Sequence, residues 1–224
     1  MKPFTVVFDL DGTLVDTAPD LIRSVGRLLE RKSLPAVPDS ELRPLISYGS
    51  RVMLKHAYSL LGVSVPPEKF EAWWREYLDI YANNISVESR PFDGLVPVLD
   101  RLAARGVNIA VCTNKTEQLS RRLLSDLALL HRFEALAGRD TFSFCKPDPR
   151  HLTETIARAG GDQTRALMVG DSDVDIDTAK AARIPVVGVT FGYCHAPVQS
   201  FAPDAVISHY DDFDAAFHKL CPGA

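Results

Sequence analysis

The fold of this chain is decided by one stretch near its start, Val6-Val7-Phe8-Asp9-Leu10-Asp11-Gly12-Thr13. Its first half belongs to an apolar, β-branched run over residues 5–8, which is typical of a buried strand. Because side chains alternate along a strand, Asp9 and Asp11 leave it on the same face. Two carboxylates at the end of a buried strand repel each other and are costly to remove from water. A divalent cation is the simplest compensation, although Asp-Gly alone would also fit an ordinary turn.

The composition is that of an ordinary globular protein. At 224 residues the chain could be one large domain or a core with a smaller one. The net charge of -4 and the lack of a Lys/Arg tract argue against non-specific nucleic-acid binding. No apolar run is long enough for a membrane span, and the first four residues leave no room for a signal peptide. The cysteines form no C-x-x-C pair, so we expect reduced thiols of a cytoplasmic protein: Cys112, Cys145, Cys194 and Cys221.

Residues 17–88 carry helical patterns and no strand signal. Helices are expected at 18–32, at 39–46 with Asp39 as the N-cap, at 50–61 and at 66–83. From residue 90 the pattern changes to alternating helices and β-branched runs. Strands are expected at 107–112, 134–137, 166–169, 185–189 and 205–208, and helices at 94–105, 115–127, 149–159, 173–182 and 211–220.

This alternation predicts an α/β fold, a doubly wound parallel sheet with a Rossmann-like core. The core is expected to comprise residues 1–16 and 89–224, with an all-helical insert at 17–88. In such sheets the functional site lies beyond the carboxyl ends of the strands, which is where Asp9 and Asp11 fall.

Two further segments follow a predicted strand or precede a helix. Thr113-Asn114-Lys115 ends the strand at 107–112 and offers a hydroxyl and backbone N–H groups, which suit an anion. A plain N-cap would explain this segment equally well. Lys146-Pro147-Asp148-Pro149 precedes another helix, and the prolines favour an extended backbone at Lys146. A lysine held in this way could serve a phosphate and the strand-end carboxylates, although a solvated surface lysine is the common alternative.

A third segment, residues 169–177, places four carboxylates within seven residues. The helix macrodipole favours some acid at a helix start, but four exceed that need. Spacing pairs Asp171 with Asp175, and Asp173 with Asp177, without choosing between the pairs. Asp171 directly follows the strand and is therefore expected nearest the strand-end site. Carboxylate oxygens with few nitrogen or sulfur ligands suit Mg²⁺.

In order and spacing these segments resemble the motifs of the haloacid dehalogenase-like hydrolases, over nearly the whole chain. The matches are Asp9-x-Asp11-Gly12-Thr13 for motif one, Thr113-Asn114 for motif two, Lys146-Pro147 for motif three and Gly170-Asp171-x-x-x-Asp175 for motif four. The helical insert resembles the family's cap domain of the first type. Within the family, residues 45–49 and 189–193 look most like those of phosphoglycolate phosphatases.

The resemblance implies a Mg²⁺-dependent phosphomonoester hydrolase. Asp9 would attack phosphorus and form an aspartyl-phosphate, while Asp11 would act first as general acid and then as base. Mg²⁺ would bind Asp9, the backbone carbonyl of Asp11, and Asp171, with Asp175 in a supporting role. The phosphoryl oxygens would be held by Thr113, Asn114 and Lys146. We expect a small phosphorylated metabolite, 2-phosphoglycolate before others, as the substrate of a monomer or homodimer without a nucleic-acid or membrane partner.

Other functions are open to the same residues. Dehalogenases of this family lack the second aspartate, so Asp11 argues against dehalogenation, whereas phosphomutases keep both aspartates. A phosphatase for a sugar phosphate or another small ester is a further alternative. A non-enzymatic phosphate-binding module is another, since fold does not determine function. No glycine-rich dinucleotide fingerprint and no P-loop is present.

Substrate choice is expected to come from the cap, because the core motifs treat all phosphate monoesters alike. Phosphoglycolate carries a carboxylate, which needs a donor in a closed site. The break between two cap helices could supply the Ser47 hydroxyl and backbone N–H groups near Gly49. Arg43 and Arg51 flank this break and could add charge-assisted hydrogen bonds. For each arginine, a solvated position on the cap surface is the alternative.

Overall fold

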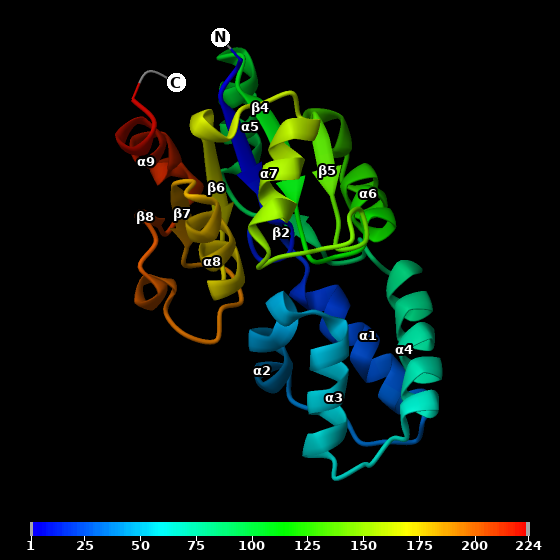
Figure 1. Ribbon diagram of the computed structural model, residues 1–224. Helices are drawn as coiled ribbons and strands as arrows, with labels where there is room; N and C mark the ends of the chain where they lie inside the picture. Colours follow the sequence, from blue (N-terminus) through cyan, green and yellow to red (C-terminus); the bar gives the residue numbers. More distant parts are fainter. Residues whose placement is uncertain (1, 223–224) are drawn as a thin grey trace.

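The computed structural model describes residues 2–222, which form an α/β core joined to a smaller helical domain (Figure 1). The core is built on six parallel strands in the order β5-β4-β1-β6-β7-β8. Their bounds are β1 Thr5–Phe8, β4 Asn108–Cys112, β5 Ala135–Ala137, β6 Ala166–Gly170, β7 Val186–Val189 and β8 Ala205–Ile207. All four residues of β1 are buried, in keeping with its central place between β4 and β6. The expected doubly wound parallel sheet is confirmed.

Helices cover both faces of the sheet. The core helices are α5 Leu95–Ala104, α6 Glu117–Asp126, α7 Pro149–Arg158, α8 Asp173–Ala182 and α9 Phe213–Leu220. Successive residues of β1 point to opposite faces: Phe8 packs against Phe213 of α9, while Val7 belongs to the cluster of Leu152 in α7 and Ile176 in α8. The core is thus a three-layer α/β arrangement, and its strand ends lie toward the helical domain (Figure 1).

The helical domain contains α1 Ala18–Arg31, α2 Asp39–Leu42, α3 Ser50–Leu60 and α4 Pro67–Ala82. Helices α1 and α4 pack side by side, and the cap core includes the fully buried side chains of Leu28 in α1, Leu54 in α3 and Tyr77 in α4. This domain matches the expected helical insert and is called the cap below.

Two expectations for the cap and its borders were wrong. Asp39 is the first residue of α2, and Pro38 is its N-cap. The expected helix at 39–46 continues from Arg43 only as a 3₁₀-helix, Arg43–Tyr48, because Pro44 has no N–H to donate to an α-helical hydrogen bond.

In the core, α6 and α9 each begin two residues later than expected, at Glu117 and Phe213.

The two chain segments that join core and cap pair with each other, which the sequence did not predict. They form a two-stranded antiparallel sheet of β2 Val15–Asp16 and β3 Arg90–Pro91. The buried carboxylate of Asp20 strengthens this junction, since it accepts hydrogen bonds from the N–H and hydroxyl of Ser89 at 2.8 and 2.7 Å. We propose core boundaries at 1–16 and 89–224 and a cap at 17–88 on this basis. Within residues 2–222, no helix has the length and apolar character needed to cross a membrane.

Candidate active site

Three carboxylates gather where β1 and β6 end. Asp9 follows β1, Asp171 follows β6, and Asp175 lies in the first turn of α8. All three are buried, and one oxygen of each lies within 4.8 Å of the others. The carboxyl ends of adjacent parallel strands meet at one edge of the sheet, which explains this convergence. Carboxylate oxygens without nitrogen or sulfur donors are the ligands that Mg²⁺ prefers, so this cluster fits the expected metal.

Lys146 supplies the one ammonium that contacts this cluster among the described residues. Its Nζ lies 2.7 Å from Asp9 Oδ1 and 2.6 Å from Asp175 Oδ1, and its side chain is 3% exposed. The solvated surface lysine considered above is therefore excluded. Asp175 is held in turn by Ser172, whose N–H and hydroxyl donate to Oδ2 at 3.2 and 2.7 Å. Asp175 thus holds the ammonium of Lys146 beside Asp9.

Burial and mutual repulsion perturb these carboxyls. Burial raises the pKa of Asp9 to about 7, with Asp175 adding to the rise and Lys146 opposing it. Burial, Asp175 and Asp9 raise the pKa of Asp171 well above its usual value. One ammonium does not compensate three buried carboxylates, so the ionised cluster needs a further cation.

Glycines allow two loops to approach Asp171 closely. A Cβ on Gly12, whose φ is +85°, would lie 2.4 Å from Asp171 Oδ2, and one on Gly192 would lie 2.2 Å from Asp171 Cβ. The backbone N–H of Tyr193 donates to Asp171 Oδ2 at 2.7 Å. The first motif and the loop after β7 therefore hold this carboxylate from two sides, and Gly12 does more than permit a turn.

Asp11 lies at the border between core and cap, outside the group of three carboxylates. Its Oδ1 accepts hydrogen bonds from Thr17 Oγ1 at 2.7 Å and from Lys115 Nζ at 2.9 Å. The side chain of Lys115 is 5% exposed and lies against the ring of Tyr81. Lys115 was not among the predicted site residues, although its place directly after Thr113-Asn114 was a usable signal. It fixes the orientation of the second aspartate.

The expected phosphate-binding residues lie at the same edge of the sheet. Thr113 is buried at the end of β4, and Asn114 Nδ2 donates to the carbonyl of Lys146 at 3.1 Å. Asn114 Oδ1 is buried without a hydrogen-bond partner among the described residues. Because α6 begins only at Glu117, the backbone N–H groups of this segment belong to a loop and not to a helix N-terminus. An anion site here depends on the loop and on Lys146.

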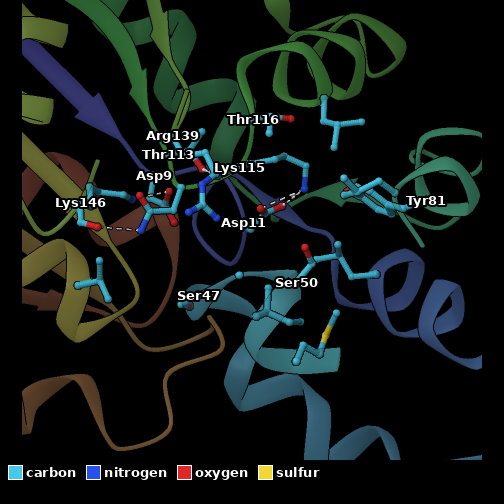
Figure 2. Close-up of a pocket in the computed structure, with 18 of the residues that line it drawn as sticks. Asp9, Asp11, Ser47, Ser50, Tyr81, Thr113, Lys115, Thr116, Arg139 and Lys146 are labelled. Carbon is cyan, nitrogen blue, oxygen red and sulfur yellow. Dashed lines mark hydrogen bonds and ion pairs between the residues drawn. The ribbon is translucent and has the colours of Figure 1, made fainter. Parts of the chain in front are cut away.

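A pocket of about 70 Å³ lies between these strand ends and the cap (Figure 2). From the core it is lined by Asp9, Asp11, Thr113, Asn114, Lys115 and Lys146, and from the cap by Ser47, Gly49, Ser50, Met53, Trp74, Tyr77 and Tyr81. Arg139, which the sequence analysis did not single out, also lines it.

The two cap arginines expected at the substrate do not line this pocket. Arg43 lies 3.5 Å from Asp16 and over the ring of Tyr193. The guanidinium of Arg51 donates to Glu71, at 2.8 Å for one of its nitrogens, and stacks on Trp74. Each arginine thus has a carboxylate partner of its own. Ser47 and Gly49, the other expected cap residues, do line the pocket.

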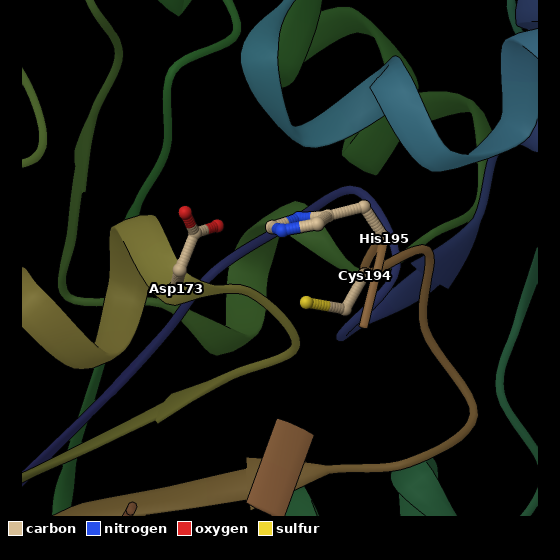
Figure 3. Close-up of side chains that lie close together, drawn as sticks. All are labelled: Asp173, Cys194 and His195. Atoms are coloured by element: carbon tan, nitrogen blue, oxygen red, sulfur yellow. The ribbon is translucent and has the colours of Figure 1, made fainter. Parts of the chain in front are cut away.

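The cap loop is tied to the core beside the pocket. Tyr48 donates its hydroxyl to Asp173 at 3.0 Å and lies 2.7 Å from His195 Nδ1. Asp173, Cys194 and His195 come together at this place (Figure 3). Asp173 therefore serves a contact between the domains, whereas Asp171 lies at the strand-end cluster, as its position in the sequence predicted.

Comparisons with known proteins agree with this geometry. Residues 6–189 match the family model described as haloacid dehalogenase-like hydrolase. A phosphoglycolate phosphatase of Mesorhizobium japonicum is 50% identical over 92% of this chain and 91% of its own. An N-acetylmuramic acid 6-phosphate phosphatase of Pseudomonas aeruginosa is 31% identical over 99% and 98%. The crystal structure of a predicted phosphoglycolate phosphatase from Haemophilus somnus superposes with a TM-score of 0.90, at 28% identity over 96% and 98%. The chain therefore belongs to the haloacid dehalogenase-like hydrolases.

Proposed function

We propose that this protein is a Mg²⁺-dependent phosphomonoester hydrolase that acts on 2-phosphoglycolate. The observation that carries the proposal is the arrangement of Asp9, in contact with Lys146 and beside Asp171, with Asp11 held separately by Lys115. A nucleophile, a charge-compensating group and a separate proton carrier then face one pocket. A pure phosphate-binding module would not need the paired aspartates.

Each residue has a distinct task in this mechanism. Asp9 attacks phosphorus and forms an aspartyl-phosphate, while the leaving oxygen takes a proton from Asp11. Asp11 then removes a proton from the water that hydrolyses this intermediate. Thr113 and Lys146 hold the phosphoryl oxygens as charge moves onto the leaving group. A Mg²⁺ ion bound by Asp9, Asp171 and the carbonyl of Asp11 would offset the repulsion between the anionic nucleophile and the phosphate.

The small pocket and the relatives support the choice of substrate. A cavity of about 70 Å³ is small, which favours a small phosphate ester over a larger sugar phosphate. The named relatives at 50, 44 and 41% identity are phosphoglycolate phosphatases. N-acetylmuramic acid 6-phosphate, named for the 31% relative, is the second candidate, but it would require a wider opening of the cap. The four cysteines are unpaired, which accords with the reducing cytoplasm, and we propose that the enzyme acts there. A monomer or a homodimer remains our expectation for its oligomeric state.

The test is release of inorganic phosphate from 2-phosphoglycolate, N-acetylmuramic acid 6-phosphate and p-nitrophenyl phosphate, with Mg²⁺ and with EDTA. We expect the highest kcat/KM on 2-phosphoglycolate and loss of activity with EDTA. Asp9→Asn should abolish turnover, whereas the exposed Asp177→Asn, a matched loss of one carboxylate, should not. Near-normal activity of Asp9→Asn would reject the nucleophile, and preference for the sugar phosphate would reject the substrate.

A further inference from the structure

Arg139 is a cation of the pocket that the proposed mechanism does not use. Three cationic side chains line the pocket: Lys115, Arg139 and Lys146. Lys146 is bound to Asp9 and Asp175, and Lys115 is bound to Asp11. The guanidinium of Arg139 makes no hydrogen bond or ion pair with another residue in the described range 2–222. It is therefore available to an anion that enters the pocket.

The fold holds the Arg139 backbone next to the phosphate-binding loop. Its N–H donates to the carbonyl of Lys115 at 3.0 Å. The preceding Gly138 packs so closely on the start of α6 that a Cβ there would lie 2.3 Å from the N atom of Glu117. Arg139 thus follows the end of β5, and its backbone is held beside the loop of residues 113–116. Its side chain extends from the core toward the cap (Figure 2).

The cap loop faces this guanidinium. Nη1 of Arg139 lies 3.8 Å from the point that a Cβ on Gly49 would occupy, and Gly49 has a φ of +92°, which favours glycine. The hydroxyl of Ser47 lines the same pocket and is buried without a hydrogen-bond partner among the described residues. Tyr48, between them, ties the loop to Asp173 of the core. A buried hydroxyl without an acceptor is unfavourable, and a ligand oxygen in the pocket would satisfy the hydroxyl of Ser47.

We propose that Arg139 recognises the carboxylate of the substrate, with the Ser47 hydroxyl as a second donor. A guanidinium presents parallel N–H groups that match the two oxygens of a carboxylate, which an ammonium cannot do. In 2-phosphoglycolate one CH₂ group and the ester oxygen separate carboxylate from phosphorus, so both ends fit one small pocket. The phosphoryl group lies on Thr113 and Lys146, and the carboxylate lies toward Arg139. The assignment rests on the proposed function and replaces Arg43 and Arg51 as the carboxylate-binding arginines.

The experiment compares two substrates that differ only at this end. 2-Phosphoglycolate has the carboxylate, and 2-hydroxyethyl phosphate has a CH₂OH group in its place. We expect Arg139→Gln to lower kcat/KM for 2-phosphoglycolate by about 100-fold, mainly through KM, which corresponds to about 2.7 kcal/mol. The loss on 2-hydroxyethyl phosphate should stay within about 3-fold, since only the general attraction for a dianion is weakened. Arg139→Lys should recover part of the loss, and Ser47→Ala should reproduce a smaller part of it.

The matched control is Arg101→Gln, which removes an arginine of α5 that is paired with Asp214 and does not line the pocket. It should leave both substrates unaffected. Equal losses on both substrates in Arg139→Gln would overturn the proposal, because Arg139 would then serve cap closure or folding. A carboxylate-specific loss in Tyr77→Phe or Tyr81→Phe, and none in Arg139→Gln, would also overturn it. A wild type that does not hydrolyse 2-phosphoglycolate would instead refute the proposed function.

Discussion

The hydroxyl of Tyr193 provides the most quantitative test of the junction between core and cap. It accepts hydrogen bonds from the N–H groups of Thr17 and Ala18 at 2.6 and 3.0 Å, and donates to Asp16 Oδ1 at 2.5 Å. Thr17 is the N-cap of α1, and its own side chain makes no capping hydrogen bond. A tyrosine 176 positions along the chain therefore does what an N-cap side chain usually does.

Tyr193→Phe removes this acceptor. The N–H of Thr17 is then left without a partner, whereas the N–H of Ala18 keeps a longer hydrogen bond to Asp16 Oδ1 at 3.3 Å. One unsatisfied buried N–H costs roughly 1–3 kcal/mol, so we expect the free energy of unfolding to fall by about 2 kcal/mol. For a chain of this size that lowers Tm by about 4–8 °C. Mg²⁺ dependence should not change, because the contact of Tyr193 with Asp171 uses its backbone N–H.

Urea unfolding followed by circular dichroism measures the loss, and Tyr58→Phe is the matched control. The Tyr58 ring is buried to 3% exposure, but its hydroxyl has no partner among the described residues, so its removal should cost nothing or stabilise slightly. If Tyr193→Phe is no less stable than Tyr58→Phe, the hydroxyl does not cap α1 and the reasoning is refuted.

Three further predictions concern the strand-end cluster and its surroundings. Asp171→Ala should raise the Mg²⁺ concentration for half-maximal activity by at least about 10-fold, and Asp177→Ala should not; equal shifts in the two titrations would exclude Asp171 as a ligand. Gly12→Ala should also raise the Mg²⁺ concentration for half-maximal activity, because the added Cβ would displace the carboxylate of Asp171. An unchanged Mg²⁺ titration would contradict the close approach of Gly12 to Asp171. Burial lowers the pKa of His151 to about 4, so stability falls as the unfolded state takes up a proton below pH 6.5. When the pH falls from 7 to 5, the free energy of unfolding of His151→Asn should decrease by about 2 kcal/mol less than that of the wild type. Urea unfolding at both pH values measures this, and equal decreases in the two proteins would refute the prediction.

Much of the core site could be predicted because each residue lies beside a local signal. Asp9 and Asp171 directly follow apolar, β-branched runs, and parallel topology brings such positions to one edge. A fixed position for Lys146 was predictable because Pro147 follows it and favours an extended backbone at Lys146. These expectations depend on strand order and polarity, not on how side chains from distant segments pack.

Arg139 could not be predicted, since its importance depends on two distant packing events. It follows a strand of only three residues, β5, and becomes relevant because the cap loop at Gly49 lies opposite. Arg51 shows the reverse error: it flanks that loop in sequence, yet Glu71 on the next helix binds its guanidinium. The sequence places a charge near a loop, but a competing carboxylate 20 positions away decides where it points. The strands β2 and β3 are too short for any periodic signal.

The central place of β1 also governs when a newly made chain can become an enzyme. β1 leaves the ribosome before the other strands of the core sheet. Within residues 2–222 it pairs only with β4 and β6, and the contact of Asp9 with Lys146 spans 137 positions. Closing such long loops costs entropy before any burial repays it. The cap, in contrast, has α1 and α4 as packing partners once residue 82 has been synthesised. We therefore expect the cap to fold first during biosynthesis, over an N-terminal strand whose aspartates stay in water until the last third of the chain arrives.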